Sequence, residues 1–559
     1  MDPLFIGQDE GGHRLELTEE DFETHLHGVG ASRSGKSKLI EWVAREFIRR
    51  NQGFCLIDPH GSLYDDLLQW LTYLRPRREI VLFNPSYQQR IVGFNPFRFR
   101  DAALSTQVDR LMRATLKAWG ATSTDETPRL ERWLRCGFHT LLERRLPVPA
   151  LEFVLGWKYP HVRSYLASQV ESTLIRGELE KLASYTRPQD FDSQVESSWN
   201  KLFRILSSKE LIRLMGVPSN AIDVEQIVDR GQILLVNLQP SPFFSREQAR
   251  LVGTLLIDEM WSILDQRKRV GQRKVKPFFL VIDEFQKYLT PDVSDMLDEG
   301  AKRGLHLMLF HQRLDQLRER DPEAYNAVTT NARIKLVFGG LNREDARTMA
   351  EQMFPGQIDF DRVKYFVEQT KFWPRYTRDE VFSRSSGSGA GAGTSFGDVW
   401  DPNAEGFVGS SRSSDSSNDF ETEGSTNIPV ISPEPFVERT PGAVYSLDDM
   451  LWQIADQLME QYQRHFFIRR PGHKTVAAVT PFVKPWTMST QRVAGYVDRL
   501  VSPWLAVNDV DDALATARQE ILDIAFAASE PVIVATDREP PTPKGKRQTL
   551  RKKPPPKPS

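Results

Sequence analysis

Cysteine is scarce in this sequence, and long hydrophobic runs are missing from it. Its 559 residues include two cysteines, Cys55 and Cys136, which are too few for a disulfide framework or a zinc site, so we expect a reducing, cytoplasmic environment. No run of about 18 apolar residues occurs, so the sequence predicts neither a transmembrane helix nor a signal peptide. The formal net charge is −2, so no global positive field indicates nucleic-acid binding, although local positive charge would suffice.

A phosphate-binding motif lies near the start of the chain. Residues 30–37 read Gly-Ala-Ser-Arg-Ser-Gly-Lys-Ser and fit the pattern G-x-x-x-x-G-K-[ST], with an alternating apolar run before them and a helical pattern after them. That order of strand, loop and helix is the context the motif requires. The alternative is a chance match in an ordinary Gly/Ser turn, which the flanking elements weaken.

The motif predicts how a nucleotide would be bound. Backbone N–H groups of Ser34 to Lys36 would surround the β-phosphate at the N-terminus of the following helix, where the peptide dipoles favour an anion. Lys36 would reach the β- and γ-phosphates, and the Ser37 hydroxyl would bind Mg²⁺. We therefore predict a nucleotide site formed by Gly30, Ala31, Ser32, Arg33, Ser34, Gly35, Lys36, Ser37 and Lys38.

Short apolar runs separated by helical patterns predict the fold. Residues 53–57 and 79–83 are continuous apolar segments that end in turn formers, Asp58-Pro59-His60-Gly61 and Asn84-Pro85, with a helical pattern between them. Such segments are typical of buried parallel strands. We expect a doubly wound, mainly parallel α/β sheet whose ligands collect at the carboxyl edge. Residues 101–225 instead show apolar spacings of three and four, which predict an all-helical insertion that could be a lid, a partner platform or a DNA-facing bundle.

A second apolar strand ends in two acids. Residues 277–282 lead directly into Asp283 and Glu284, as expected for the other half of a phosphate-loop ATPase site. Asp283 would hold Mg²⁺ through its water shell, and Glu284 would polarise the attacking water as general base. The alternative for Asp283 is a cap on the next helix, because Asp is a favoured capping residue.

Two further residues fit the same site. The strand at 305–310 runs into His311-Gln312, so Gln312 should lie near the γ-phosphate, where an amide can sense its presence. Arg303 ends a helix and could supply a cation to the nucleotide of an adjacent subunit, which can raise the rate by orders of magnitude. An equally good interpretation is a helix C-terminal cation that complements the dipole.

The C-terminal third predicts several different segments. Residues 382–428 are rich in Ser and Gly and should form a disordered loop. After a helix at 446–462, residues 464–470 and 474–479 are expected to add two strands to the edge of the main sheet, with His465 and His473 as surface residues rather than metal ligands. The tail carries Lys544, Lys546, Arg547, Arg551, Lys552, Lys553 and Lys557. It would bind a polyanion or simply solubilise the chain.

Together these residues resemble the HerA/FtsK superfamily of DNA-pumping ATPases and, within it, the TraG/TraD-type conjugative coupling proteins. The resemblance extends to about residue 485. It is carried by the loop at 30–37, Ile57-Asp58-Pro59-His60-Gly61, Phe94-Asn95-Pro96, the strand at 233–238, Ile282-Asp283-Glu284-Phe285 and the spacing from Arg303-Gly304 to Gln312. It implies a RecA-like P-loop NTPase core, ATP and Mg²⁺ as cofactors, a hexameric ring with nucleotide sites between subunits, and DNA in the centre. The residues that take the family roles are Lys36, Ser37, Asp283, Glu284, Gln312 and Arg303.

Two features of those relatives have no counterpart in the pattern. Membrane-anchored coupling proteins begin with transmembrane helices and HerA motors with a small β-barrel, whereas this loop starts at residue 30. We therefore expect a soluble protein without membrane insertion, from a mobile element, with a relaxase or a secretion or defence protein as partner. For Asp58 and His60 a satisfied turn is the safer interpretation.

The expected function is an ATP-hydrolysing DNA translocase. The alternatives are a nucleotide-gated scaffold with slow turnover, a HerA-like repair or defence motor, and an ATPase that moves protein. The expected organisation is a first part of the ATPase core at 1–100, the helical insertion at 101–225, a second part of the core at 226–381, the Gly/Ser loop at 382–428, a helix and hairpin returning to the core at 429–485, a helical segment at 486–538 and a basic Pro-rich tail at 539–559.

Overall fold

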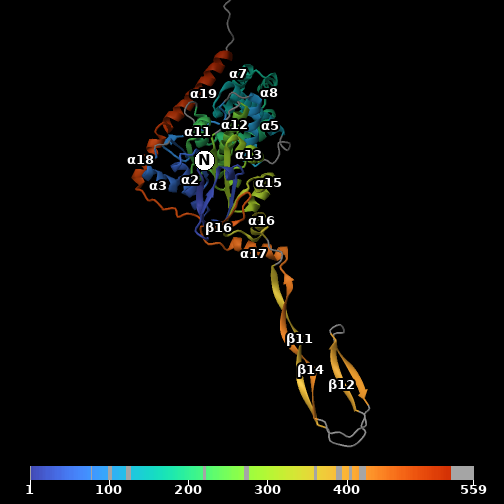
Figure 1. The fold of residues 1–559 in the computed structure, drawn as a ribbon. Coiled ribbons are helices and arrows are strands. Elements are labelled where there is room, and N and C mark those ends of the chain that lie inside the picture. The colour runs from blue at the N-terminus through green and yellow to red at the C-terminus, as the bar shows by residue number, and fades with distance from the viewer. Residues whose placement is uncertain are drawn as a thin grey trace, which may run out of the picture. The chain divides into compact units, whose positions relative to one another are not determined.

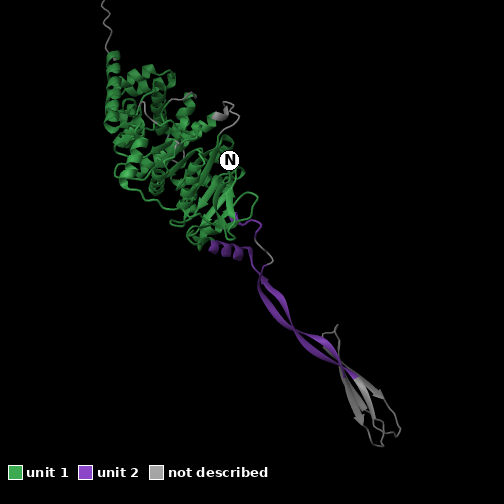
Figure 2. Ribbon diagram, turned by 60° about the vertical axis from the view of Figure 1, so that its left-hand side comes forward, with its two compact units in different colours: residues 1–349, 458–559 green, residues 350–457 purple. Residues whose placement is uncertain are grey.

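The computed structural model describes residues 2–76, 79–98, 103–120, 128–217, 222–269, 276–357, 362–384, 393–401, 406–414 and 423–529. The basic tail expected at 539–559 lies outside these ranges. The chain divides into two compact units, residues 1–349 with 458–559 and residues 350–457, coloured green and purple in Figure 2. Among the described residues, no helix is long and apolar enough to cross a membrane.

The first unit is built on one large sheet, which contains eleven strands of the described residues. Its central strands run parallel. In spatial order they are β10 (Ile334–Phe338), β3 (Leu26–Val29), β9 (Leu305–His311), β8 (Phe278–Ile282), β4 (Phe54–Asp58), β7 (Ile233–Asn237) and β5 (Ile80–Phe83). This confirms the predicted α/β class with a mainly parallel sheet. The short apolar runs form these strands because both faces of a parallel sheet are covered.

Antiparallel strands extend one edge of the sheet. β15 (His465–Arg469) pairs with β10, and β16 (Val476–Val479) pairs with β15. This confirms the expected return of C-terminal strands to the sheet. β1 (Leu4–Asp9) and β2 (Arg14–Leu17) continue beyond β16. This N-terminal hairpin was not predicted, because its partner strand lies at the other end of the chain.

Helices cover both faces of the sheet (Figure 1). Successive residues of β4 point to different clusters: Phe54 and Leu56 belong to one and Cys55 and Ile57 to the other, as the alternation of a strand requires. The first cluster includes residues of α2 (Lys36–Arg49) and α3 (Ser62–Leu74), and the second includes residues of α12 (Arg246–Arg269). Helices thus bury both faces of the central strands, so a ligand can approach them only at the strand ends.

Between β6 (Arg90–Ile91) and β7 the described residues form helices and no strand. These are α4 (Leu104–Ala118), α5 (Pro128–Arg144), η1 (Val148–Ala150), α6 (Leu151–Leu155), α7 (Pro160–Gln169), α8 (Thr173–Ala183), α9 (Pro188–Leu206), α10 (Lys209–Gly216) and α11 (Val224–Arg230). The C-terminal helix α19 (Val507–Ser529) docks on them, because Arg213 on α10 donates two hydrogen bonds to Asp511, of 2.7 and 2.5 Å.

Shorter elements complete the first unit and surround the sheet edges. They are α1 (Glu19–Phe22), the 3-10 helices η2 (Phe285–Lys287) and η3 (Ala301–Arg303), α13 (Val293–Glu299), α14 (Leu314–Arg320), α15 (Pro322–Asn331), α16 (Arg343–Met353), which runs into the second unit, α18 (Thr490–Val501) and β17 (Leu505–Ala506), which pairs with β6.

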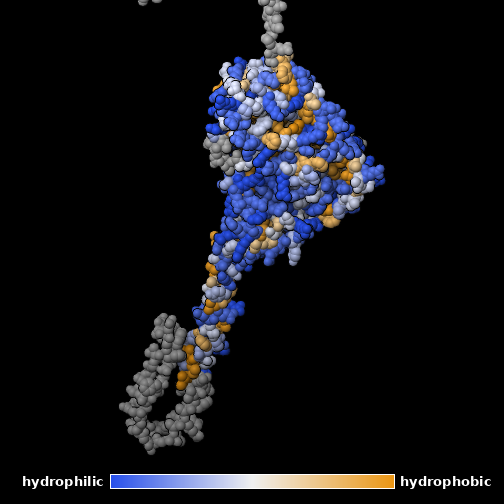
Figure 3. All heavy atoms as spheres, turned by 180° about the vertical axis from the view of Figure 1, so that it is seen from behind, coloured by the Kyte–Doolittle hydropathy of each residue, from blue (hydrophilic) through white to orange (hydrophobic). Residues whose placement is uncertain are grey.

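The second unit contains a long two-stranded ribbon. β11 (Val363–Arg384) pairs antiparallel with β14 (Glu423–Val444), and β12 (Gly393–Asp401) pairs with β13 (Gly406–Ser414). α17 (Leu447–Met459) follows. Parts of 382–428, expected to lack structure, are therefore strand. A Ser- and Gly-rich composition leaves few apolar side chains to bury, but cross-strand backbone hydrogen bonds need no apolar side chains. Large residues such as Trp373 and Tyr376 are exposed, and hydrophobic residues appear along this ribbon in Figure 3.

Candidate active site

The phosphate loop follows β3 at the carboxyl edge of the sheet, and its glycines are required by close contacts. A Cβ atom at Gly30 would lie 2.5 Å from the Cβ of Phe338. Gly35 has a φ of 112° and caps α2, so no side chain occupies the first amides of that helix. Free amide groups at a helix N-terminus form an anion site. The Ser34 hydroxyl oxygen is buried and has no hydrogen-bond partner in the described part of the chain, which is what a phosphate ligand would supply.

The other predicted loop residues have different surroundings. The Ala31 N–H donates to the Gly339 carbonyl at 3.1 Å, and Ser32, Arg33 and Ser37 are exposed. Lys38 does not face the loop. Its Nζ lies 2.8 Å from carboxylate oxygens of Glu41 and Asp66.

Lys36 is buried at the centre of the site. Its side chain is 5% exposed, its Nζ donates to the Gly30 carbonyl at 3.2 Å, and it lies 4.0 Å from Oε1 of Glu284. A cation and an anion at this separation attract each other. The loop and the acid pair, about 250 residues apart in the sequence, are thus brought together by the fold.

Asp283 and Glu284 follow the buried strand β8. The pKa of Asp283 is raised to about 6, chiefly by burial; Lys36 opposes this rise, and the Glu284 and Asp58 carboxylates add to it. Glu284 has a φ of 53°, the left-handed conformation that a side chain rarely adopts. Such backbone strain concentrates at functional sites. The Asp283 carboxyl thus lies beside the loop with its negative charge only partly balanced by Lys36.

These residues fit a magnesium ion held together with a nucleotide. No group of three or more His, Cys, Asp or Glu side chains in the described residues forms a metal cage. Mg²⁺ at phosphate sites needs no such cage, because one or two protein oxygens suffice when phosphates and waters complete the shell. The buried Asp283 carboxyl, with its charge only partly balanced, meets that requirement.

Gln312 also lies at the loop. It follows β9, the strand next to β3, and its Oε1 accepts a hydrogen bond of 3.1 Å from the Ser32 hydroxyl. Arg303 precedes the same strand and therefore lies at the opposite, amino edge. There its guanidinium contacts the carboxylates of Asp265 and Glu299 and lies 4.8 Å from the Trp261 ring centroid. Within one subunit, Arg303 is not near the loop.

Asp58 and His60 form a turn at the same carboxyl edge. Asp58 accepts backbone N–H groups from His60 at 2.8 Å and from Tyr64 at 2.9 Å, which agrees with the expected satisfied turn. His465 and His473 are both exposed. The described residues therefore place neither histidine in a buried polar cluster.

Sequence reasoning missed the contact between the C-terminal hairpin and the loop. Arg464, which precedes β15, donates its N–H to the Ser34 carbonyl at 2.8 Å. Its Cα would lie 2.7 Å from a Cβ at Gly35. β15 is antiparallel to β10, so its first residue comes to the carboxyl edge. The apolar strand pattern predicted the hairpin, but no local signal predicted that it supports the loop.

A buried histidine pair beneath the loop was also missed. His27 on β3 and His311 on β9 stack with ring centroids 4.8 Å apart, and their Nε2 atoms are 2.5 Å apart. Burial lowers the pKa of His311 to about 4 and that of His27 well below its ordinary value. Both rings are therefore neutral at pH 7, and one donates to the other across the two strands that carry the loop and Gln312.

Comparisons with known proteins agree with this arrangement. Residues 277–365, which include Asp283, Glu284 and Gln312, match the family model TraG-D_C, described as the TraM recognition site of TraD and TraG. This chain resembles the TraG/TraD-type coupling proteins. The resemblance expected from the motifs is thereby confirmed. The search of curated proteins found no match.

The chain is also similar to solved structures, to different degrees. Plasmid coupling protein TrwB in complex with the ATP analogue ADPNP has a TM-score of 0.50 and 14% identity, over 88% of this chain and 92% of that chain. The unbound monoclinic form of the bacterial conjugative coupling protein TrwBΔN70 has a TM-score of 0.49 and 15% identity, over 87% and 90%. VirB4 of Thermoanaerobacter pseudethanolicus has a TM-score of 0.41 and 14% identity, over 63% and 87%. The TrwB complex supports the RecA-like core expected from the motifs.

Proposed function

We propose that this chain is an ATP-dependent DNA translocase that works in the cytoplasm as a hexameric ring, in DNA transfer or processing for a mobile element. One observation carries the proposal: the buried Lys36 and the acids after β8 meet at the carboxyl edge, with Nζ 4.0 Å from Oε1 of Glu284. The resemblance to TraD and TraG supports the biological setting. It also supports a protein partner, such as a relaxase or a secretion or defence protein.

In this proposal each residue has one task in ATP hydrolysis. Glu284 accepts a proton from the attacking water, and Lys36 balances charge that develops on the transferred phosphoryl group. Gln312 orients groups at the γ-phosphate. Ser37 and Asp283 would hold Mg²⁺, which would supply positive charge against the phosphates. Arg303 is the candidate for a cation donated to the neighbouring subunit, for which its ion pairs with Asp265 and Glu299 would have to open.

The direct test is ATP turnover of the purified protein with and without DNA. We expect DNA to raise the rate. Equal rates would remove the translocase assignment and favour a nucleotide-gated scaffold, and stimulation by a partner protein alone would favour a protein-moving ATPase.

The Glu284→Gln variant tests the hydrolytic site itself. We expect turnover to fall by about 10²–10⁴-fold, the usual contribution of a general base, while ATP still binds and ATP-bound rings accumulate in electron micrographs. Glu323→Gln is the matched control, because Glu323 is exposed on α15. Rapid turnover by Glu284→Gln would take Glu284 out of the mechanism.

A further inference from the structure

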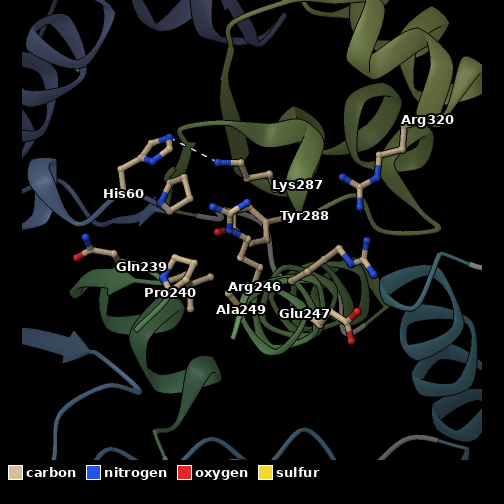
Figure 4. Close-up of a pocket in the computed structure, with 12 residues that line it drawn as sticks. His60, Gln239, Pro240, Arg246, Glu247, Ala249, Lys287, Tyr288 and Arg320 are labelled. Carbon is tan, nitrogen blue, oxygen red and sulfur yellow. Dashed lines mark hydrogen bonds between the residues drawn. The ribbon is translucent and has the colours of Figure 1, made fainter. Parts of the chain in front are cut away.

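A cavity of about 620 Å³ lies beside the acid pair at the carboxyl edge (Figure 4). It is lined by residues that follow β4, β7 and β8, by the start of α12 and by the end of α14. Its cations are Arg246, Arg250, Lys287 and Arg320. The lining carboxylate, Glu247, pairs with Arg204 at 3.0 Å. None of the four cations has a carboxylate partner within the described ranges of the chain.

The charge that lines this cavity is therefore mainly positive. Burial lowers the pKa of Arg320, and the Arg250 guanidinium lowers it further. Nε of Arg250 is buried without a hydrogen-bond partner among the described residues. Lys287 points toward His60 (Figure 4), and its Nζ lies 3.5 Å from Nε2 of His60. Like charges that converge on a cavity are stabilised by an anion, and guanidinium groups match phosphate best.

The same turn that lines the cavity also holds the proposed general base. Gln286 in η2 is buried, and its Nε2 donates to Oε2 of Glu284 at 2.7 Å and to Oε1 of Gln316 at 3.1 Å. Its own Oε1 has no hydrogen-bond partner in the described residues. A buried acceptor without a partner carries a free-energy cost. The Gln286 amide therefore donates its hydrogen bonds but lacks one as acceptor, and this cost favours a different position of the side chain.

Arg320 connects the two features. Its NH1 donates to the Gln286 carbonyl at 2.8 Å, and the same side chain lines the cavity. Charge-assisted bonds from guanidinium to phosphate are stronger than a bond to a neutral carbonyl. A phosphate in the cavity would therefore draw Arg320 away from Gln286 and loosen the hold of Gln286 on Glu284.

We propose that this cavity binds backbone phosphates of a nucleic-acid strand, and that Arg320 and the positioning residue Gln286 transmit that binding to Glu284. The inference rests on the proposed function and names a route by which DNA stimulates hydrolysis. The phosphate can shift the turn only because it binds Arg320 more strongly when Arg320 has left the Gln286 carbonyl than when it is still bonded there.

The binding test compares Arg320→Gln with Arg318→Gln, using a fluorescein-labelled single-stranded oligonucleotide and fluorescence anisotropy. Arg318 lies on the same helix, outside the cavity, and pairs with Glu344 at 3.1 Å. We expect Arg320→Gln to weaken binding and to reduce the salt-dependence slope by about 1, as for the loss of one phosphate contact. Equal affinities and slopes for the two variants would overturn the proposal. A competition experiment with ATP could also overturn the proposal. It uses the Lys36→Ala variant, in which ATP binding at the phosphate loop is weakened, and adds ATP at the same phosphate concentration as the oligonucleotide. If ATP then displaced the oligonucleotide, the cavity would be a general phosphate site.

The coupling test measures the ratio of DNA-stimulated to basal ATP turnover. We expect Gln286→Ala to raise the basal rate and to bring this ratio toward one. A purely structural defect would lower both rates together and leave the ratio unchanged, which would contradict a positioning role. Binding of a fluorescent ATP analogue confirms that each variant is folded. If wild-type turnover does not respond to DNA, the proposed function fails; if it responds and Arg320→Gln responds equally, only this inference fails.

Discussion

The carboxyl and amino edges of the main sheet differ in whether their charged side chains have partners of opposite charge. At the carboxyl edge, Lys36 and Glu284 are buried together, and the cavity cations have no carboxylate partners in the described residues. At the amino edge, Arg303 is enclosed by Asp265 and Glu299 and covers Trp261. Uncompensated charge costs folding free energy. The difference teaches that the carboxyl edge has cations, unpaired within the described part of the chain, that a charged ligand could bind, whereas Arg303 at the amino edge already has two carboxylate partners.

Removing Lys36 should have the largest effect at the carboxyl edge. We expect Lys36→Ala to lower ATP turnover by at least about 10²-fold, the usual cost of losing a preorganised electrostatic group, and to weaken nucleotide binding. Arg49→Ala at the far end of the same helix is the control, because that side chain is half exposed and pairs with Glu46. Similar turnover in the two variants would contradict the asymmetry of the edges.

Neutralising Asp283 should stabilise the fold while it damages the site. The pKa of Asp283 is about 6 in the folded protein and 3.8 ordinarily. As the pH rises, the unfolded chain therefore loses this proton at a lower pH than the folded protein does. The free energy of unfolding of the wild type consequently falls between about pH 4 and about pH 6. A pKa difference of about two corresponds to ~3 kcal/mol. We expect Asp283→Asn to be more stable than wild type by up to that amount above pH 6, and equally stable below pH 4.

Urea unfolding at pH 7.5 and at pH 4 measures this difference. A gain that does not depend on pH would show that the carboxyl is not held at a raised pKa. The same variant should lose Mg²⁺-dependent nucleotide binding, which titration with a fluorescent ATP analogue reports.

Gly35 tests the contact between the loop and the C-terminal hairpin. Its φ of 112° and the 2.7 Å approach to Arg464 leave no room for a methyl group. We expect Gly35→Ala to destabilise the protein by about 1–3 kcal/mol, the cost of such backbone strain. Gly177 on α8 has open space around it, so Gly177→Ala should stabilise by about 0.5–1 kcal/mol. Thermal unfolding should therefore give opposite signs for the two variants.

Arg303→Ala should have the smallest effect on a single subunit. Asp265 and Glu299 are partly exposed, so we expect a loss of about 1 kcal/mol in unfolding free energy and an unchanged nucleotide affinity. Turnover of the assembled ring separates the two interpretations of this residue. A loss of about 10³-fold would assign Arg303 to the neighbour's nucleotide, and a loss of less than threefold would leave it as a helix-end cation.

The sheet and the loop were predictable because their signals are local. A strand, a glycine loop and a helix occur in succession at 24–44, and parallel strands place their carboxyl ends at one edge, so Asp283, Glu284 and Gln312 were expected beside Lys36. The β15–β16 hairpin was expected for the same reason, since its turn and strands are adjacent in the sequence.

The features that were missed depend on residues far apart in the chain. Arg464 reaches Ser34 only because β15 is antiparallel to β10. The cavity gathers cations from α12, η2 and α14, and each of them in isolation is typical of a solvated surface. The bond from Arg320 to Gln286 depends on the packing of α14, which periodicity does not report.

The N-terminal hairpin has a consequence for synthesis on the ribosome. β1 joins the sheet through β16, with Gln8 opposite Val479, about 470 residues later in the chain. At ~5–20 residues per second, the hairpin waits roughly half a minute to a minute and a half for its partner to be made. During that interval β1 can pair with β2, but its other edge has no partner strand. Exposed strand edges of this kind promote aggregation, which chaperones counteract. Translation speed and chaperone supply are therefore expected to affect the yield of this protein.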